Sequence, residues 1–288
     1  MAHLMTLRHL LLVALLLTSC NYYNNSDKKY GSPKGYNLTE PTRFHVRQSM
    51  QEISGIVLAP DEHHIMAIND EQGRIFSIDI ANKTAYPNWK FHKSGDYEDL
   101  ATDGKNWIVL KSNGHLYHVT GLFSDSTSSE TYKLPMEGKK EFESLYYDAR
   151  NDGMIMVCKQ CAEDKGKDYN TAYRFDMKTW EFDTVPFYRI NIVDIERLSG
   201  EDINLFKPSA AAIHPFEKRL YILSAVNRML VIADLDGKVQ EAYNLKHTLF
   251  RQPEGISFAA NGDMYISNES ADESSANILK FKYNQRAQ

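Results

Sequence analysis

Three glutamates occupy the same position in a short phrase that recurs along the chain. They open Glu98-Asp-Leu-Ala, Glu143-Ser-Leu-Tyr and Glu254-Gly-Ile-Ser, while serine opens Ser54-Gly-Ile-Val and Ser209-Ala-Ala-Ala. If the fold brings these positions together, two carboxylates about 6 Å apart repel by roughly 3 kcal/mol at an effective dielectric near 20. Such a group must be neutralised by protons, by lysine or by a bound cation.

The spacing of the phrases predicts the elements that carry them. Consecutive phrases begin 44, 45, 66 and 45 residues apart, and each is followed by a turn and a second apolar run. Short strands repeated at this period are typical of a β-propeller, with one blade per repeat. We therefore predict an all-β fold with five visible blade repeats. The longer third step leaves room for a helix or loop over residues 192–206, or for a degenerate sixth blade.

The ends of the propeller domain are predicted to meet in one blade. The last repeat has no residues left for a fourth strand, and residues 43–47, before the first repeat, are a candidate for it. The N-terminal strand would then close the ring.

In a propeller the innermost strand of each blade starts, and its neighbour ends, on the same face. The residues at these two positions are therefore expected to surround one mouth of the central channel. The candidate metal ligands among them are Glu98, Glu143, Glu254, Asp70, Glu71, Asn268 and Glu269. The candidate substrate contacts are Ser54, Lys111, Lys159 and Ser209. If the protein is an enzyme, Glu98 and Glu254 are the candidate catalytic residues.

This predicted mouth has two interpretations. Carboxylate, amide and hydroxyl oxygens suit Ca²⁺ better than zinc or copper, which favours a bound calcium ion. The alternative is a structural rim, in which the glutamates cap backbone amides and pair with Lys111 or Lys159.

The N-terminus has the pattern of an export signal. Arg8 and His9 precede an apolar run over residues 10–17, and Leu17-Thr-Ser-Cys20 resembles a bacterial lipobox. This run is far shorter than the roughly 20 residues that span a bilayer. We predict a lipoprotein signal peptide over residues 1–19, a lipidated Cys20, a polar tether over residues 20–40 and the propeller from residue 41 to residue 288. An ordinary signal peptide with a chance cysteine is the alternative. Asn21 favours outer-membrane over inner-membrane anchoring.

Composition and cysteine usage narrow the possible partners. The net charge of −5 argues against a nucleic-acid ligand, which favours a basic face. Cys158 and Cys161 form a lone C-x-x-C pair with no second pair, so we expect a local disulfide or two free thiols rather than zinc. The protein is expected to be a monomer that meets a small-molecule or protein ligand at the channel mouth.

Several phrases together resemble the SdiA-regulated, YjiK-like propeller family of bacterial envelope proteins. They are Glu52-Ile-Ser-Gly-Ile, Asn69-Asp-Glu, Tyr97-Glu-Asp-Leu, Phe142-Glu-Ser-Leu, Asp234-Leu-Asp-Gly-Lys and Pro253-Glu-Gly-Ile. The resemblance covers roughly residues 45–285. It implies a periplasm-facing, calcium-associated propeller of unestablished activity. The fourth repeat departs from the pattern, because Lys207-Pro-Ser-Ala stands where an acidic or Ser-Gly opening is expected.

Three functions follow from these features. The first is a membrane-anchored, ligand-binding envelope module with a Ca²⁺ site. The second is a metal-dependent hydrolase, because lactonase and phytase propellers that the chain resembles use metal and carboxylates at this mouth. No nucleophile elbow of the G-x-S-x-G type is present. The third is a protein-interaction scaffold, for which the 11% aromatic content could supply an anchor patch.

Overall fold

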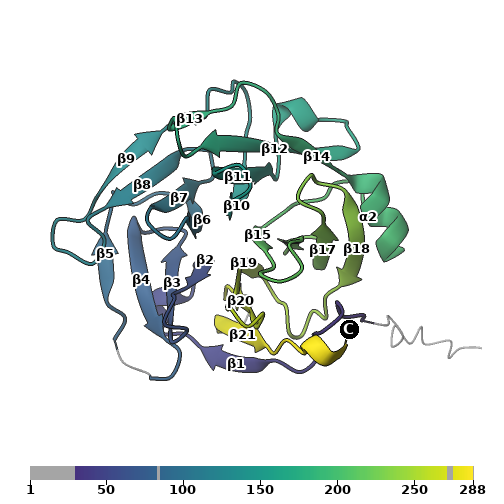
Figure 1. Cartoon of the computed structure of the whole chain (residues 1–288), viewed down its shortest axis with the longest axis horizontal. Helices are drawn as coiled ribbons and strands as arrows, with labels where there is room; N and C mark the ends of the chain where they lie inside the picture. The colour runs from purple at the N-terminus through teal and green to yellow at the C-terminus, as the bar shows by residue number, and fades with distance from the viewer. Residues whose placement is uncertain (1–29, 83–84, 271–274, 288) are drawn as a thin grey trace, which may run out of the picture. The chain divides into compact units, whose positions relative to one another are not determined.

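The repeated phrases form the innermost strands of five antiparallel sheets in a computed structural model that describes residues 30–82, 85–270 and 275–287. Figure 1 shows the sheets as blades around a central axis. The first blade contains β2 (Ile53–Leu58), β3 (His64–Asn69), β4 (Arg74–Asp79) and β5 (Asn88–Lys90). The second contains β6 (Tyr97–Thr102), β7 (Trp107–Lys111), β8 (Leu116–Thr120) and β9 (Ser128–Tyr132).

The remaining blades follow the same order from the axis outward, and blade three has an additional strand that pairs with β12. Blade three contains β10 (Phe142–Asp148), β11 (Gly153–Cys158), β12 (Tyr169–Asp176), β13 (Glu181–Phe182) and β14 (Tyr188–Asn191). Blade four contains β15 (Ala210–Ile213), β16 (Leu220–Ser224), β17 (Met229–Ala233) and β18 (Val239–Asn244). Blade five contains β19 (Pro253–Phe258), β20 (Met264–Asn268), β21 (Asn277–Phe281) and β1 (Thr42–His45).

The N-terminal strand closes the ring, as predicted. β1 pairs antiparallel with β21, from Thr42 opposite Lys280 to His45 opposite Asn277. Figure 1 shows this junction, where the two ends of the propeller share one sheet.

The innermost strands pack against one another around the axis, because β2, β6, β10, β15 and β19 each contact the next. Two glycines permit this approach. A Cβ atom on Gly55 would lie 2.2 Å from Asp99 Oδ1 of blade two, and one on Gly255 would lie 2.6 Å from Ser54 O of blade one. Larger residues at these positions would push neighbouring blades apart.

Apolar side chains fill the spaces between the blades. Between blades two and three, for example, Leu110 and Leu116 pack with Leu145 and Met156 in one buried cluster. The innermost strands are therefore held rigidly, and so are the residues at their ends.

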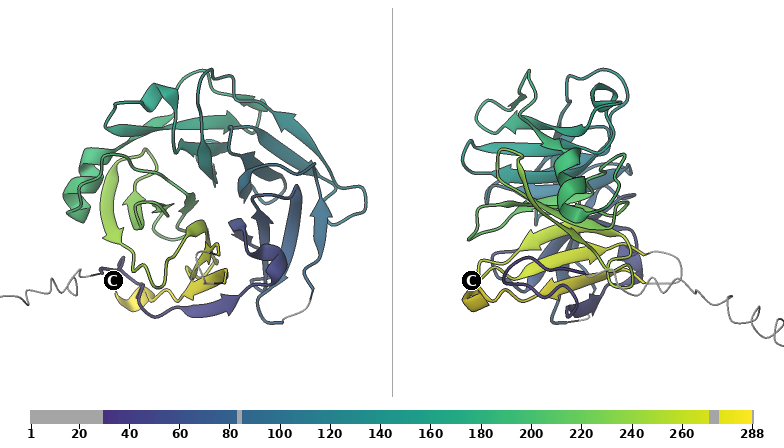
Figure 2. Two further views of the ribbon diagram at one scale, coloured as in Figure 1. Left: turned by 180° about the vertical axis from the view of Figure 1, so that it is seen from behind. Right: turned by 90° about the vertical axis from the view of Figure 1, so that its right-hand side faces the viewer.

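The long third step contains a helix and an extra strand rather than a sixth blade. Within the described ranges the protein has five blade sheets, and α2 (Ile192–Ser199) lies between β14 and β15. Asn191 caps its first turn by accepting hydrogen bonds from Val193 N and Asp194 N, and Gly200 ends it in the left-handed conformation. Figures 1 and 2 place α2 on the outer edge beside β18.

The segment before β1 differs from the expected tether. The compact unit begins at Gly31 rather than at residue 41. Tyr36 and Leu38 are buried in an apolar cluster, and Tyr36 Oη donates a hydrogen bond to Gly262 O at 2.5 Å. The polar composition of this segment predicted a tether, but the burial of Tyr36 and Leu38 and the hydrogen bonds of Tyr36 and Gly35 attach it to the propeller. The signal sequence and Cys20 lie outside the described residues.

Candidate functional site

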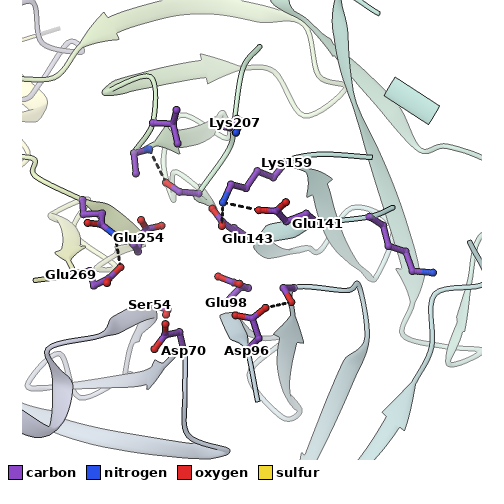
Figure 3. Close-up of a pocket in the computed structure, with 16 residues that line it drawn as sticks. Ser54, Asp70, Asp96, Glu98, Glu141, Glu143, Lys159, Lys207, Glu254 and Glu269 are labelled. Carbon is purple, nitrogen blue, oxygen red and sulfur yellow. Dashed lines mark hydrogen bonds and ion pairs between the residues drawn. The ribbon is translucent and has the colours of Figure 1, made fainter. Parts of the chain in front are cut away.

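A cavity of about 690 Å³ opens at the predicted mouth of the channel. Figure 3 shows its lining, in which acidic side chains predominate. Seven carboxylates and three lysines line it, which gives a formal charge of −4. The carboxylates are Asp70, Asp96, Glu98, Glu141, Glu143, Glu254 and Glu269, and the lysines are Lys140, Lys159 and Lys207.

Strand irregularities aim the three repeated glutamates at the cavity. The pairing of β6 with β7 skips from Tyr97 to Asp99, so Glu98 is the extra residue of a bulge. Glu143 and Glu254 occupy the same irregularity at the starts of β10 and β19. Bulges of this kind redirect a side chain and are frequent beside functional sites. In blade four β15 pairs regularly from Ala210, and the residue that lines the cavity there is Ser209 rather than a carboxylate.

The unpaired carboxylates lie on blades one, two and five. Figure 3 shows Glu98 and Glu254 pointing into the cavity with no hydrogen bond to another lining residue. Asp70 Oδ1 is buried and has no hydrogen-bond partner among the described residues. Glu269 accepts one hydrogen bond from Gln252 Nε2 at 2.7 Å. Buried acceptors of this kind need a proton or a cation.

Burial and mutual repulsion favour protonation of this group. Burial, followed by the charges of Glu143 and Asp96, raises the pKa of Glu98 to about 9. Burial and Glu52 raise the pKa of Glu269 to about 8, and burial with Glu52 raises that of Asp70 to about 6. The pKa of Glu254 is also raised, first by burial and then by Glu143. At neutral pH and without a cation, the site therefore takes up protons.

The rim on blade three is neutralised differently. Lys159 pairs with Glu143 and, at 3.1 Å, with Glu141. Burial disfavours the Lys159 ammonium, but these two carboxylates outweigh it and raise its pKa. Burial raises the pKa of Glu143, and Lys159 opposes the shift. Blade three thus has the salt-bridged rim that was one of the two interpretations, whereas no lysine pairs with Glu98, Glu254 or Asp70 among the described residues.

Three predicted site residues do not line the cavity. Glu71 is exposed one residue beyond Asp70. Asn268 is fully buried inside blade five, where its Nδ2 donates to Asn277 Oδ1 at 3.3 Å. Lys111 lies beside Gly95 instead. Lys111 and Asn268 end their second strands and Glu71 lies two residues beyond one, but a position at a strand end did not suffice to bring these side chains into the cavity lining.

Sequence reasoning missed several lining residues, chiefly Asp96 and Glu141. Both lie two residues before a bulged glutamate, Glu98 or Glu143. This repeated acidic-x-Glu spacing is a signal that the sequence contains. Lys207 and Gln252, by contrast, lie in loops whose direction no local pattern indicates.

A family model described as SdiA-regulated matches residues 36–271. This chain belongs to the SdiA-regulated family. Family membership agrees with the resemblance carried by the repeated phrases, including those that open the bulged strands.

Solved structures of low sequence identity share the fold. Glutaminyl cyclase from Myxococcus xanthus has a TM-score of 0.54 and 13% identity, covering 84% of this chain and 94% of that chain. A luciferin-regenerating enzyme has a TM-score of 0.50 and 9% identity, covering 85% of this chain and 96% of that chain. At these identities the likeness extends to the propeller architecture alone. No curated protein matches the chain.

Proposed function

We propose that this member of the SdiA-regulated family is a lipid-anchored envelope protein that binds Ca²⁺ at the acidic mouth and presents it to a small polar ligand. The observation that carries the proposal is the group of half-buried carboxylates without a lysine partner, Glu98, Glu254 and Asp70, with Glu269 beside them. A cation neutralises such a group more effectively than partial protonation, and it supplies the partner that Asp70 Oδ1 lacks.

The donor chemistry selects a hard cation. The candidate ligands are carboxylate oxygens, with Ser54 and Ser209 hydroxyls on the same cavity wall, and no cysteine or histidine lines the cavity. Oxygen-rich sites of this kind suit Ca²⁺. When bound, the ion would supply a positive charge and open coordination positions for oxygen atoms of a ligand.

The rest of the cavity suits a ligand with acidic or polar groups. Its volume of about 690 Å³ exceeds the space that one ion occupies. Lys140 and Lys207 line the same cavity, and neither pairs with a carboxylate in the described part of the chain. A small anion could therefore reach the ion and a lysine together.

Thermal unfolding of chelator-treated protein during a calcium titration tests this proposal. The wild type should gain melting temperature with calcium, because a ligand at about 100 times its Kd adds roughly 2.7 kcal/mol of stability. Glu98→Gln/Glu254→Gln should not respond. The matched control is Glu130→Gln/Glu181→Gln, which changes two exposed glutamates on the outer strands β9 and β13. Its melting temperature should rise with calcium as that of the wild type does. An equal response of all three proteins would overturn the proposal.

The envelope location rests on the N-terminal sequence. No helix among the described residues is long and apolar enough to cross a membrane. A lipid on Cys20 would provide the attachment, and mass spectrometry of the mature N-terminus tests it. Cys20→Ser should release the protein from the membrane fraction; retention of that variant would contradict lipid anchoring.

A metal-dependent hydrolase is the second candidate. In its favour, the cavity combines lysines with carboxylates that lack hydrogen-bond partners, so Glu98 or Glu254 could act as a general base beside a bound ion. Lactone and phosphoester screens with and without calcium test it. Turnover that Glu254→Gln abolishes would support catalysis, and the absence of turnover at saturating calcium would leave the binding module.

A further inference from the structure

A second cavity, of about 590 Å³, lies at the junction of blades three and four and shares Lys159 and Lys207 with the mouth. Unlike the mouth, it has a largely apolar wall. Ile192 and Phe206 are buried beneath it, and Leu205 exposes 54% of its surface at its edge.

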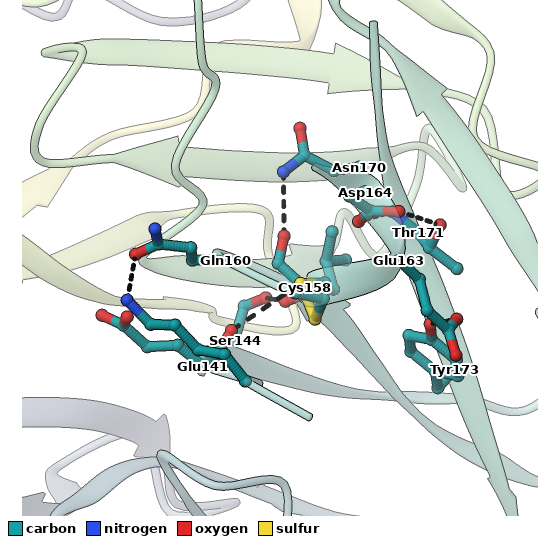
Figure 4. The surroundings of a disulfide bond; sticks show 12 residues. Glu141, Ser144, Cys158, Gln160, Glu163, Asp164, Asn170, Thr171 and Tyr173 are labelled. Carbon is teal, nitrogen blue, oxygen red and sulfur yellow. Dashed lines mark hydrogen bonds between the residues drawn. A yellow bond between two sulfur atoms is a disulfide. The ribbon is translucent and has the colours of Figure 1, made fainter. Parts of the chain in front are cut away.

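The loop that forms one side of this cavity is fixed in place. Cys158 and Cys161 form a disulfide at its start, which is one of the two states expected from their spacing. Figure 4 shows the surroundings of this bond. Asp164, in the short helical turn η2 (Ala162–Asp164), accepts hydrogen bonds from Thr171 N at 2.9 Å and Thr171 Oγ1 at 2.6 Å. The wall is therefore largely preformed, as ligand sites generally are.

The charge around the cavity is positive. Five lysines line it, against the single carboxylate of Asp164, which Thr171 already occupies. Within the described ranges, Lys165, Lys167 and Lys207 form no ion pair. An anionic group at this edge would therefore meet uncompensated positive charge.

One buried polar atom beside this cavity lacks a partner in the described part of the chain. Asn170 is only 5% exposed, and its Nδ2 donates to Cys158 O and Phe206 O, both at 2.9 Å. These two bonds fix the orientation of the amide, so the remaining atom is the acceptor Oδ1. It is buried and has no hydrogen-bond partner among the described residues, and Asn170 lines the cavity. A ligand with an N–H or O–H group would satisfy it.

We propose that this cavity binds a small organic anion that combines an apolar body with a hydrogen-bond donor. The anionic group would meet Lys165 and Lys167, the apolar body would lie against Leu205 and Phe206, and the donor would face Asn170 Oδ1. This site does not depend on calcium at the mouth.

Three fluorescent probes that differ by one group each test this assignment. Anilinonaphthalenesulfonate has an anion, two aromatic systems and an N–H donor. Its N-methyl derivative lacks the donor, and N-phenylnaphthylamine lacks the anion. The purified full chain in chelator should bind the first probe saturably at one site, and the other two roughly tenfold more weakly.

Matched variants locate the binding. Lys165→Gln/Lys167→Gln should weaken the anionic probe roughly tenfold and leave the uncharged probe unchanged. The control Lys105→Gln/Lys178→Gln removes the same charge from exposed turns on the opposite face, after β6 and β12, and should change the affinity less than twofold.

A second pair of variants tests the apolar wall. Leu205→Glu should abolish binding of the anionic probe. The control is Val185→Glu, because Val185 is 65% exposed and does not line the cavity, and this variant should bind the probe as the wild type does. The side chains of both residues are exposed, so neither change should prevent folding. Three results would overturn the assignment. They are the absence of saturable binding, an equal effect of a variant and its control in either pair, and an equal affinity for all three probes.

Discussion

Replacing Glu98 with glutamine should stabilise the calcium-free protein, and the gain should grow with pH. Burial and the neighbouring carboxylates raise the pKa of Glu98 from 4.5 to about 9. The folded state thus binds a proton that the unfolded state releases above pH 4.5. This contribution to stability is fully present below pH 4.5 and is lost as the pH rises toward 9.

The magnitude follows from that difference. At pH 8 the ordinary pKa lies 3.5 units below the pH, and each unit corresponds to about 1.4 kcal/mol, so the carboxyl group lowers the unfolding free energy by about 5 kcal/mol. At pH 5 the same reasoning gives less than about 1 kcal/mol. Glutamine resembles the protonated carboxyl in shape and cannot ionise, so Glu98→Gln should escape this cost.

Urea denaturation in chelator at pH 5 and pH 8 measures the effect. Glu98→Gln should be more stable than the wild type at pH 8 and nearly equal to it at pH 5. Glu181→Gln, on the exposed outer strand β13, should match the wild type at both values. Saturating calcium should reverse the order at pH 8, because the wild type gains a ligand that the variant has lost. A difference that is independent of pH, or a destabilised variant at pH 8, would refute the reasoning.

Three further predictions follow. Calcium binding at pH 7 should release protons, because the pKa values of Glu98 and Glu269 are about 9 and 8 before binding. Calorimetry in buffers of different ionisation enthalpy measures this proton release, and a binding heat that does not depend on the buffer would contradict it. Cys158→Ala/Cys161→Ala should lower the free energy of unfolding by about 2 kcal/mol, because the disulfide restricts the unfolded chain. The melting temperature should then fall by about 4–8 °C, and an unchanged melting temperature would count against this prediction. His214 is fully buried on the face opposite the mouth, and burial lowers its pKa to about 4. Its contribution to stability is therefore present above pH 6.5, and the unfolding free energy falls by about 3 kcal/mol as the pH drops to 4. His214→Gln should reduce this loss of stability in acid, as measured by denaturation curves at several pH values, and an equally steep loss would refute the assignment.

The sequence predicted the blades and the glutamates of the mouth because both depend on local pattern. Turns and apolar runs recur with each repeat, and Glu98, Glu143 and Glu254 open corresponding strands. The bulges that aim these side chains depend on pairing register between two strands. Register is a property of the assembled sheet, so the phrase alone could not reveal it.

The errors in the site have similar causes. Asn268 and Glu71 were predicted from their positions at or just beyond the ends of second strands, but Asn268 is buried inside blade five and Glu71 is exposed, because a strand end does not by itself set the direction of a side chain. The cavity beside Lys165 and Lys167 was not predicted, because it forms only when the loop after Cys161 meets residues 205–207 from the next blade.

The most direct test of the central claim is a crystal structure of the protein in saturating calcium, with anomalous diffraction data to locate the ion. We expect a calcium peak at the mouth, within coordination distance of carboxylate oxygens from at least two of Asp70, Glu98, Glu254 and Glu269. A mouth without a peak under these conditions, with the same carboxylates protonated or paired with lysine, would contradict it.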